Sequence, residues 1–196
     1  MNNTTQTLQQ NITAAKQAFD QLAALSEPID RAARLVGEAL ANGRKLLACG
    51  NGGSAADAAH LTTEFVCRFD ADRPPYPAIC LTTQGGDLTA IGNDYAFDEL
   101  FARQVRAFGA EGDVLVAIST SGNSANVRRA IQAGRDVGLH TIALLGRDGG
   151  ACADLAEVEL LCPGENTARI QEVHILVIHT VCQIVEQMIG TMSEQR

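Results

Sequence analysis

Short apolar segments alternate with helical stretches along most of this 196-residue chain, and this alternation restricts its fold more than any other feature. The expected strands are residues 45–49, 78–81, 114–118, 141–145 and 158–161, and the expected helices are residues 4–25, 28–40, 54–68, 125–137 and 168–189. Short apolar strands separated by helices indicate a parallel sheet that helices cover on both faces. We therefore predict one α/β domain, in which ligands bind beyond the carboxyl ends of the strands.

Charge and cysteine usage argue against several classes of function. The formal net charge is −8 and no cluster of Lys and Arg marks a nucleic-acid face, so we expect no direct binding of DNA or RNA. No apolar run approaches the ~20 residues that span a bilayer, and the first residues lack the pattern of a signal peptide. The six cysteines are scattered without a C-x-x-C pair, which argues against a zinc–thiolate site or a disulfide framework. We expect a cytoplasmic protein that does not bind membranes.

A hydroxyl-rich loop follows the expected strand that ends at Ile118. Residues 119–124 read STSGNS, with four hydroxyl side chains directly before an expected helix. Exposed N–H groups and the helix dipole favour an anion at a helix N-terminus, and hydroxyls add donors without a fixed charge. A simple N-cap at Ser124 would explain only one of the four hydroxyls. We interpret the loop as a phosphate cradle that is neither a P-loop nor a nucleophile elbow, because both motifs are absent from the sequence.

A glycine-rich turn, CGNGGS at residues 49–54, follows the first expected strand. Gly50, Gly52 and Ala55 formally match the G-x-G-x-x-A fingerprint of dinucleotide-binding proteins. That fingerprint also requires an acidic residue about 20 positions on, at the end of the next strand. Here that strand ends in residues 81–83, LTT, and a dinucleotide would leave the hydroxyl-rich loop unexplained. A dinucleotide site is therefore the weaker alternative.

Several side chains that can bind a metal occur in two of the expected helices. His60 and Glu64 are spaced i,i+4, so they share a helix face and can bind one divalent metal. On spacing alone, an exposed polar pair explains them better, but they lie close to the expected ligand site. His179 lies among apolar residues of the last helix, so on this pattern we expect it to be buried and to satisfy a core hydrogen bond. His174 has no evident partner and is expected to be structural.

Four segments carry a resemblance that covers nearly the whole chain. They are CGNGGS (49–54), GND (92–94), AISTSGNSANV (117–127) and ARIQEVHILVIH (168–179). Together they resemble the sedoheptulose 7-phosphate isomerases, also called phosphoheptose isomerases, of the sugar isomerase (SIS) domain superfamily. This resemblance implies a three-layer α/β/α sandwich around a five-stranded parallel sheet, with extra N-terminal helices. It implies one SIS domain over residues 1–196, in which residues 1–43 serve oligomer packing and residues 44–196 form the sheet core and C-terminal helix.

The resemblance also implies a reaction and a site. The reaction would convert sedoheptulose 7-phosphate, a ketose, into D-glycero-D-manno-heptose 7-phosphate, an aldose, on the way to lipopolysaccharide heptose. The implied ligands of one zinc ion per site are His60, Glu64, Gln171 and His179. The implied substrate contacts are Asn51, Gly52, Gly53, Glu64, Asn93, Asp94, Ser119, Thr120, Ser121, Ser124 and Gln171. Glu64 and His179 are the acid–base candidates for a cis-enediol mechanism, and the sequence does not assign which is the base.

The spacing of Gln171 and His179 sets a geometric condition on this ligand set. In a regular helix, eight residues correspond to about 12 Å of rise and about 80° of rotation, whereas metal–ligand bonds are only ~2 Å long. Either the last helix begins after Gln171, or the site takes ligands from more than one chain. We favour a site shared between chains, in line with the homotetramer that the resemblance implies. The apolar face of the first helix, residues 8–22, also needs a partner surface, in the same subunit or in another.

Two other functions remain open at this stage. Residues 77–94 and 101–109 are similar to a sister group of SIS proteins that associate with the bacterial replication initiator. As a group these proteins do not keep residues like Glu64 and His179 together, so their joint presence favours the enzyme over a non-catalytic adaptor. The other alternative is a regulator that senses a sugar phosphate.

Overall fold

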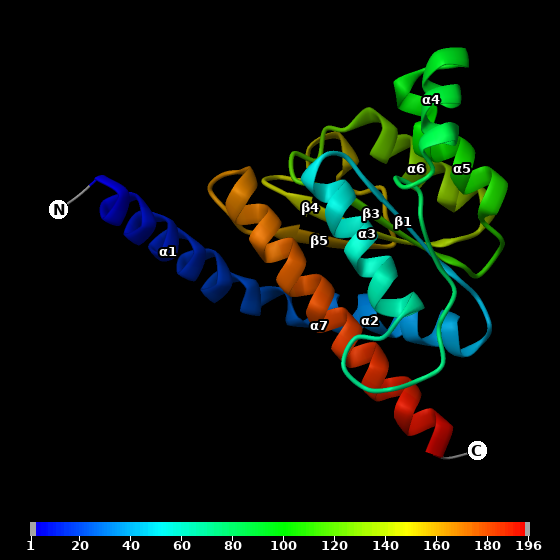
Figure 1. Ribbon diagram of the computed structural model, residues 1–196, viewed down its shortest axis with the longest axis horizontal. Coiled ribbons are helices and arrows are strands. Elements are labelled where there is room, and N and C mark those ends of the chain that lie inside the picture. Colours follow the sequence, from blue (N-terminus) through cyan, green and yellow to red (C-terminus); the bar gives the residue numbers. More distant parts are fainter. Residues whose placement is uncertain (1–2, 195–196) are drawn as a thin grey trace.

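A five-stranded parallel sheet lies at the centre of the molecule, with helices on both of its faces (Figure 1). The computed structural model describes residues 3–194. Its strands are β1 (Leu46–Gly50), β2 (Ala78–Cys80), β3 (Val114–Ser119), β4 (His140–Gly146) and β5 (Val158–Cys162), in the order β2-β1-β3-β4-β5. Every pair of neighbouring strands is parallel. The predicted α/β/α sandwich with five parallel strands is therefore confirmed.

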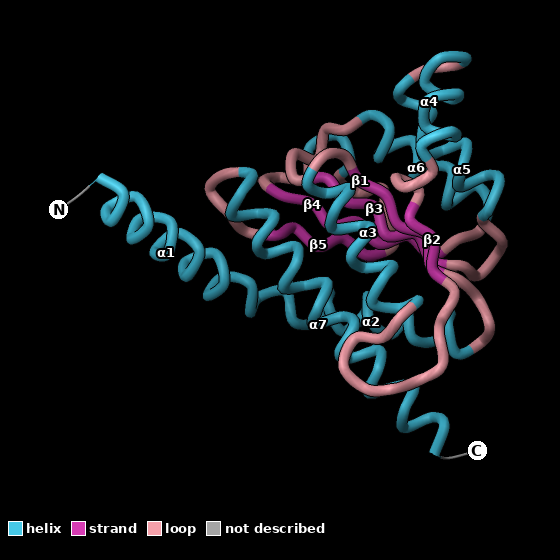
Figure 2. The backbone as a smooth tube through the Cα atoms, viewed as in Figure 1, coloured by secondary structure: helices cyan, strands magenta, loops and turns pink. Residues whose placement is uncertain are grey.

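The helices form the two outer layers (Figure 2). They are α1 (Asn3–Leu22), α2 (Ser26–Ala41), α3 (Gly53–Val66), α4 (Gly85–Asp94), α5 (Leu100–Phe108), α6 (Ala125–Val137) and α7 (Thr167–Glu194), with 3-10 turns η1 (Ala23–Leu25), η2 (Phe97–Glu99) and η3 (Gly150–Cys152). One core lies between the sheet and α2, α3 and α7, and the other lies between the sheet and α5 and α6. Leu46 and Ala48 of β1 enter the first core and Leu47 and Cys49 the second, as alternation along a strand requires.

The expected elements omit α4 and α5. Helix α4 has two glycines in its first turn and no fully buried residue, and only Leu88 and Ile91 pack partly against the second core, so its helical pattern is weak in the sequence. Helix α5 has only nine residues, but Leu100, Phe101 and Val105 form a buried stripe at helical spacing. That pattern was present in the sequence and could have identified α5.

The strand order places two loops in one crevice. From β1 the chain moves outward to β2 on one side, and from β3 it moves to β4 and β5 on the other. The neighbours β1 and β3 therefore form the topological switch point, where open α/β sheets bind ligands outside the carboxyl ends of their strands. The glycine turn (residues 51–53) follows β1 and the serine loop (residues 119–124) ends β3 and leads into α6. The fold thus brings together the two loops that the sequence singles out.

Helix α1 extends away from the body of the molecule (Figure 1). Ala18 and Leu22 are buried, whereas Leu8, Ile12 and Phe19 are 60%, 42% and 39% exposed. Most of the apolar face of this helix therefore lacks a partner within the described part of the chain. The role of residues 1–43 in oligomer packing stays a prediction, although α2 within that range packs against α7 in the core.

Helix α7 crosses the molecule and packs against α1, α2 and α3. Within the described residues, its segment Thr167–Gly190 is long and apolar enough to cross a membrane by length and composition, and 44% of the most apolar window is buried. The sequence predicts no apolar run of ~20 residues anywhere in the chain, and polar residues such as Gln171, Glu172 and His174 interrupt this segment. Core helices of soluble proteins satisfy the same criterion, so the finding is weak evidence for a membrane span.

Candidate metal and catalytic site

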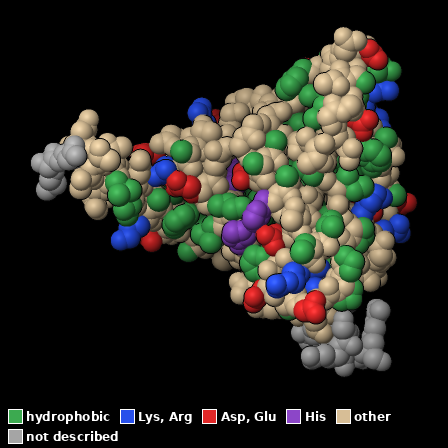
Figure 3. Space-filling view, viewed as in Figure 1, with side chains coloured by type: hydrophobic (Ala, Val, Ile, Leu, Met, Phe, Trp, Pro, Cys, Tyr) green, Lys and Arg blue, Asp and Glu red, His purple; other side chains and the backbone are tan. Residues whose placement is uncertain are grey.

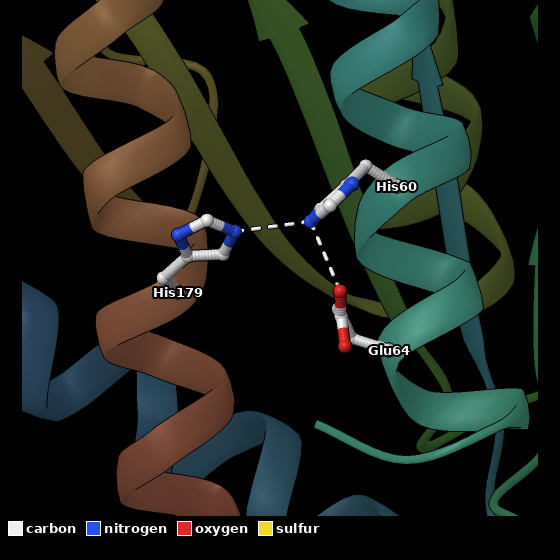
Figure 4. A group of neighbouring side chains, drawn as sticks. All are labelled: His60, Glu64 and His179. Atoms are coloured by element: carbon white, nitrogen blue, oxygen red, sulfur yellow. Dashed lines mark hydrogen bonds and ion pairs between the residues drawn. The ribbon is translucent and has the colours of Figure 1, made fainter. Parts of the chain in front are cut away.

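Three side chains that can bind a metal meet between two helices (Figure 4). His60 and Glu64 of α3 and His179 of α7 place one ligand atom each within 4.8 Å of one another. His60 Nε2 lies 3.0 Å from His179 Nε2 and 3.0 Å from Glu64 Oε1. The His60 side chain is 44% exposed, and histidine side chains are visible at the middle of this face in Figure 3. The cluster is therefore accessible to a metal ion and to a substrate.

The cluster exists because α3 and α7 lie side by side and run in the same direction. Gln171 lies against Gly53 near the start of both helices, and His179 meets His60 further along both. A Cβ added to Gly53 would lie 2.0 Å from Gln171 Nε2, so a larger residue there would displace the Gln171 side chain from this position. Once the two helices pack in this register, residues seven or eight positions further on face each other, as His60 and His179 do.

Gln171 lies outside the three-residue cluster. Helix α7 begins at Thr167, so the alternative in which the helix starts after Gln171 is wrong. The contact of Gln171 with Gly53 is seven residues before His60, which corresponds to about 10 Å of helical rise. One chain therefore brings together three of the four expected ligands. A site completed by a second chain stays a prediction.

The two histidines of α7 lie in different environments. His179 is only half-buried, and its ring centroid lies 5.1 Å from that of His60 and 5.7 Å from that of Phe69, so the expected core position is wrong. His174 is fully buried, and its Nε2 lies 3.4 Å from the carbonyl oxygen of Leu145. Five residues along a helix correspond to about 140° of rotation, so the two rings face different sides.

His174 is a buried histidine with incomplete hydrogen bonding. Its Nδ1 has no hydrogen-bond partner among the described residues. Burial lowers the pKa of His174 to about 4, and the hydrogen bond with the Leu145 carbonyl opposes this only in part. The ring is therefore neutral at physiological pH, which agrees with the expected structural role.

Asp57 is a candidate that the sequence reasoning missed. It lies on α3 one turn before His60, and its Oδ2 atom is buried without a hydrogen-bond partner among the described residues. Burial raises the pKa of the Asp57 carboxyl, and the nearby charge of His60 lowers it to a smaller extent. Acids with a perturbed pKa next to a reactive cluster are typical of functional sites. Its i,i+3 spacing from His60 was the signal that could have identified it.

The glycine turn and the first turn of α6, which follows the serine loop, are joined by a pair of amides. Asn51 Nδ2 donates to Asn126 Oδ1 at 2.8 Å, and Asn126 Nδ2 donates to Asn51 Oδ1 at 2.9 Å. Asn126 Oδ1 also accepts the backbone N–H of Val127 in the first turn of α6. Asn126 lies within the segment that carries the resemblance, but its link to Asn51 could be seen only in three dimensions. Through it, the implied substrate residue Asn51 is fixed to the first turn of α6, directly after the serine loop.

The hydroxyls of the serine loop are not used to cap α6. Ser124 lies at the N-cap with extended backbone, and its side chain makes no cap hydrogen bond. Its Oγ accepts instead from Ser119 Oγ at 3.2 Å, so a simple N-cap does not explain Ser124. Thr120, Ser121 and Ser124 are each partly exposed. The loop therefore presents hydroxyls at a helix N-terminus, the arrangement that binds a phosphate.

The serine loop is held by its neighbours. Gly122 has φ +67°, and an added Cβ would lie 2.0 Å from the carbonyl oxygen of Gly149, so no other residue fits there. Asn123 Oδ1 accepts the backbone N–H of Ala151 at 3.0 Å. Both contacts attach the loop to η3, which keeps its hydroxyls in place before a ligand arrives.

Two implied substrate residues lie elsewhere. Asn93 and Asp94 are exposed at the end of α4, where Asn93 Nδ2 donates to Asp94 Oδ1 at 2.8 Å. Helix α4 packs against η2 and α5, and Figure 1 shows it at the opposite end of the molecule from α1. The described part of this chain does not bring Asn93 and Asp94 to the cluster, so their role stays a prediction.

The fold and the loops at the switch point define a sugar isomerase (SIS) domain, and the SIS domain family matches residues 10–146. Curated relatives extend the similarity over most of the chain. The phosphoheptose isomerase of Bordetella avium is 53% identical over 169 residues (85% of this chain, 86% of the relative), and that of Thiobacillus denitrificans is 50% identical over 184 residues (92% and 93%). The chain belongs to the phosphoheptose isomerase family of SIS domain proteins.

Solved structures agree with this assignment. The structure of phosphoheptose isomerase GmhA from Neisseria gonorrhoeae matches with a TM-score of 0.89 and 46% identity, covering 94% of this chain and 100% of that one. A phosphoheptose isomerase from Francisella tularensis matches with a TM-score of 0.91 and 39% identity, covering 94% and 99%. The three-layer fold is therefore shared with these isomerases over nearly its whole length.

Proposed function

We propose that the protein is a zinc-dependent aldose–ketose isomerase that converts sedoheptulose 7-phosphate into D-glycero-D-manno-heptose 7-phosphate for lipopolysaccharide heptose. The observation that carries this proposal is the convergence of His60, Glu64 and His179 in a chain about half identical to phosphoheptose isomerases. A non-catalytic adaptor for a replication initiator would not need a carboxylate and two imidazoles in contact. The isomerase therefore accounts for the cluster, and the adaptor does not.

The three side chains fit a zinc ion. Zinc takes imidazole nitrogen and carboxylate oxygen at about 2.0–2.2 Å, and tetrahedral geometry then places donor atoms about 3.4 Å apart. The distances of 3.0 Å from His60 Nε2 to its two neighbours are close to that value. Three protein donors leave a position for a fourth ligand or for substrate oxygens. When bound there, zinc supplies charge that polarises the sugar carbonyl and stabilises negative charge on oxygen.

The protein groups carry the protons. Isomerisation moves one proton between C1 and C2 and another between the two oxygens, through a cis-enediol. Glu64 and His179 lie on either side of His60, so one can remove the carbon-bound proton while the other serves the oxygens (Figure 4). Such positioned groups typically contribute ~10²–10⁴-fold each. The serine loop and the N-terminus of α6 would bind the phosphate and fix the far end of the sugar.

The proposed active form is a homotetramer with shared sites. Gln171 is held away from the cluster of its own chain, and Asn93 and Asp94 are hydrogen-bonded to each other at the exposed end of α4. The exposed apolar residues of α1 offer a surface on which a second copy can pack. A cytoplasmic location is proposed as well, because all six cysteines are free, as is usual in a reducing compartment.

An isomerase assay tests the proposal directly. The purified protein is expected to convert sedoheptulose 7-phosphate into the aldose, to lose this activity after treatment with a chelator, and to regain it with zinc. His179→Ala is expected to lower kcat at least 100-fold, whereas exchange of an exposed residue far from the site, such as Lys16→Ala, leaves it unchanged. Absence of turnover by the wild type, together with tight binding to a replication initiator, would support the adaptor instead.

A further inference from the structure

The segment between α3 and β2 does not run directly from helix to strand. Residues 67–77, which we call the strap, swing past α7 before they return to β2 (Figure 1). The strap begins one turn after Glu64 and contacts the helix that carries His179. It therefore joins the two helices that form the metal cluster.

Glu186 of α7 anchors the strap through a partly buried carboxylate. One of its oxygens accepts the backbone N–H groups of Asp70 at 3.2 Å and Ala71 at 3.0 Å, and the other accepts Arg73 Nε at 3.0 Å. The side chains of Arg73 and Glu186 are only 10% and 11% exposed. Burial by itself would raise the pKa of Glu186, but these hydrogen bonds together bring that pKa below its usual value. Glu186 is therefore charged at neutral pH and fully engaged.

Arg73 extends this contact to the end of α3. Its guanidinium donates to the carbonyl oxygens of Glu64 at 2.6 Å and Phe65 at 3.0 Å. The last carbonyls of a helix lack intrahelical donors, and a cation there also interacts favourably with the helix dipole. Arg73 thus binds the backbone of Glu64 itself and connects it to Glu186.

The strap also touches the second catalytic candidate. Its Phe69 ring lies 5.7 Å from the ring of His179, tilted by 43°. Glu186 follows His179 by seven residues on α7, about two turns, so the anchor and the imidazole lie on the same side of that helix. The contacts of the strap therefore reach both Glu64 and His179.

We propose that Arg73 and Glu186 are positioning residues that set the spacing of α3 and α7 at the metal cluster. This inference rests on the proposed function, because it concerns the geometry of the same site. The apolar core beneath, with Phe65, Val177 and Ile178, already holds both helices against the sheet. The Arg73–Glu186 contact links α3 to α7 directly, so it controls the distance between the two helices. That distance determines whether Glu64 and His179 can bind the same ion. Sites of this kind require their groups within about 0.5 Å of the productive geometry.

Asp113 provides a matched control. It is also a buried carboxylate that accepts two backbone N–H groups, from Lys45 and Ala110, and one cationic side chain, Lys45. It lies at the amino end of β3, whereas the serine loop follows the carboxyl end of the same strand. Loss of its charge removes similar hydrogen bonds without touching the strap, so the effect of a general loss of stability can be subtracted.

The test compares Glu186→Gln, Arg73→Lys and Asp113→Asn with the wild type. Three quantities are measured: the zinc dissociation constant, by competition with a chromophoric chelator, the kcat and KM of the isomerase, and the thermal midpoint. Glu186→Gln is expected to weaken zinc binding about 10–100-fold, the range for groups that orient metal ligands, and to lower kcat with KM changed less than threefold. Arg73→Lys keeps the positive charge but loses the several N–H donors of the guanidinium group, and it is expected to show a smaller effect in the same direction. Asp113→Asn is expected to lower only the thermal midpoint.

Two results would overturn the inference. One is a Glu186→Gln or folded Arg73→Lys protein whose zinc affinity and kcat stay within twofold of the wild type. The other is an Asp113→Asn protein that loses as much zinc affinity and kcat as Glu186→Gln at equal thermal midpoint. Zinc affinity is measured without substrate. If the wild type binds zinc but shows no turnover, the proposed reaction is refuted, and the zinc affinities of the strap variants still test the role of the strap. If the wild type turns over the substrate and the strap variants keep wild-type zinc affinity and kcat, the proposed reaction is supported and the positioning role of Arg73 and Glu186 is refuted.

Discussion

Gln171 of α7 lies directly against Gly53 of α3, about two helical turns before the cluster that His179 forms with His60. The parallel register of α3 and α7 produces both contacts at once. Because Gln171 and His179 are fixed on one regular helix, no small movement brings both to one ion. If Gln171 binds the metal, it does so in another copy of the chain.

A subunit-mixing experiment tests this arrangement. Gln171→Ala and His179→Ala are each expected to be nearly inactive alone. When the two variants are assembled together, about a quarter of the sites would combine an intact Gln171 from one chain with an intact His60, Glu64 and His179 from the other, and activity should recover in proportion.

A second mixture serves as its control. His60→Ala and His179→Ala alter the same cluster within one chain, so their mixture should stay inactive. Lack of recovery in the first mixture, with co-assembly demonstrated by mass spectrometry, would contradict a shared site.

Zinc is expected to stabilise the protein through the three-residue cluster. A ligand at 100 times its dissociation constant adds about 2.7 kcal/mol to the free energy of unfolding. The thermal midpoint of chelated protein should rise on addition of zinc, and His60→Ala and His179→Ala should abolish most of that rise. A rise of unchanged size in both variants would place the zinc elsewhere.

Asp57→Asn is expected to separate stability from activity. The pKa of Asp57 is raised by burial, so the folded state favours the protonated acid and loses stability as pH rises above the ordinary carboxyl range near 4. A neutral amide of the same shape removes that cost, so the free energy of unfolding at pH 7.5 should stay equal or rise. We expect kcat to fall about 10²–10⁴-fold, the range for a positioned acid or base. A variant with full kcat would show that Asp57 is not functional.

His174 should make the protein sensitive to mild acid. Its pKa is about 4 in the folded state, below the value near 6.5 of an unperturbed histidine. The unfolded chain then binds the extra proton, so the stability contributed by the neutral ring is complete above pH 6.5 and is lost as pH falls toward 4. At pH 5 this loss is about 2 kcal/mol.

The comparison protein for that measurement is His174→Leu. Denaturant unfolding of chelated wild type and variant, at pH 7.5 and pH 5, gives two differences in the free energy of unfolding. Protonation of all other groups is common to both proteins and cancels. The wild type should lose more stability than the variant on acidification, and an equal loss would contradict the neutral buried ring.

Much of the fold was predictable because its signals are local. The apolar segments that became β1, β3, β4 and β5 are short, bounded by polar residues and separated by helical patterns. Helix α4 was not predicted because it has no fully buried residue, and the two apolar residues that pack partly against the core, Leu88 and Ile91, form too short a pattern. The buried stripe of α5 was present but brief.

The site was predictable in part, through residue types and resemblance. His60 and Glu64 share a helix face by spacing alone. The prediction that His179 is buried, which was based on its apolar neighbours, was wrong because those neighbours do not reveal which side of α7 faces the sheet. Asp57 and the Asn51–Asn126 pair needed three-dimensional contacts to be recognised.

By itself, the sequence determined the α/β class, the two loops beyond the strand ends and the residue types available for metal and proton chemistry, because these depend on periodicity and on short motifs. Only the tertiary structure decided that α3 and α7 run parallel in one register, which unites His60, Glu64 and His179 and sets Gln171 apart. It also revealed the strap that ties both helices through Arg73 and Glu186. The physical reason is that register between distant helices follows from side-chain packing and glycine contacts across more than a hundred residues of sequence, which local patterns do not encode.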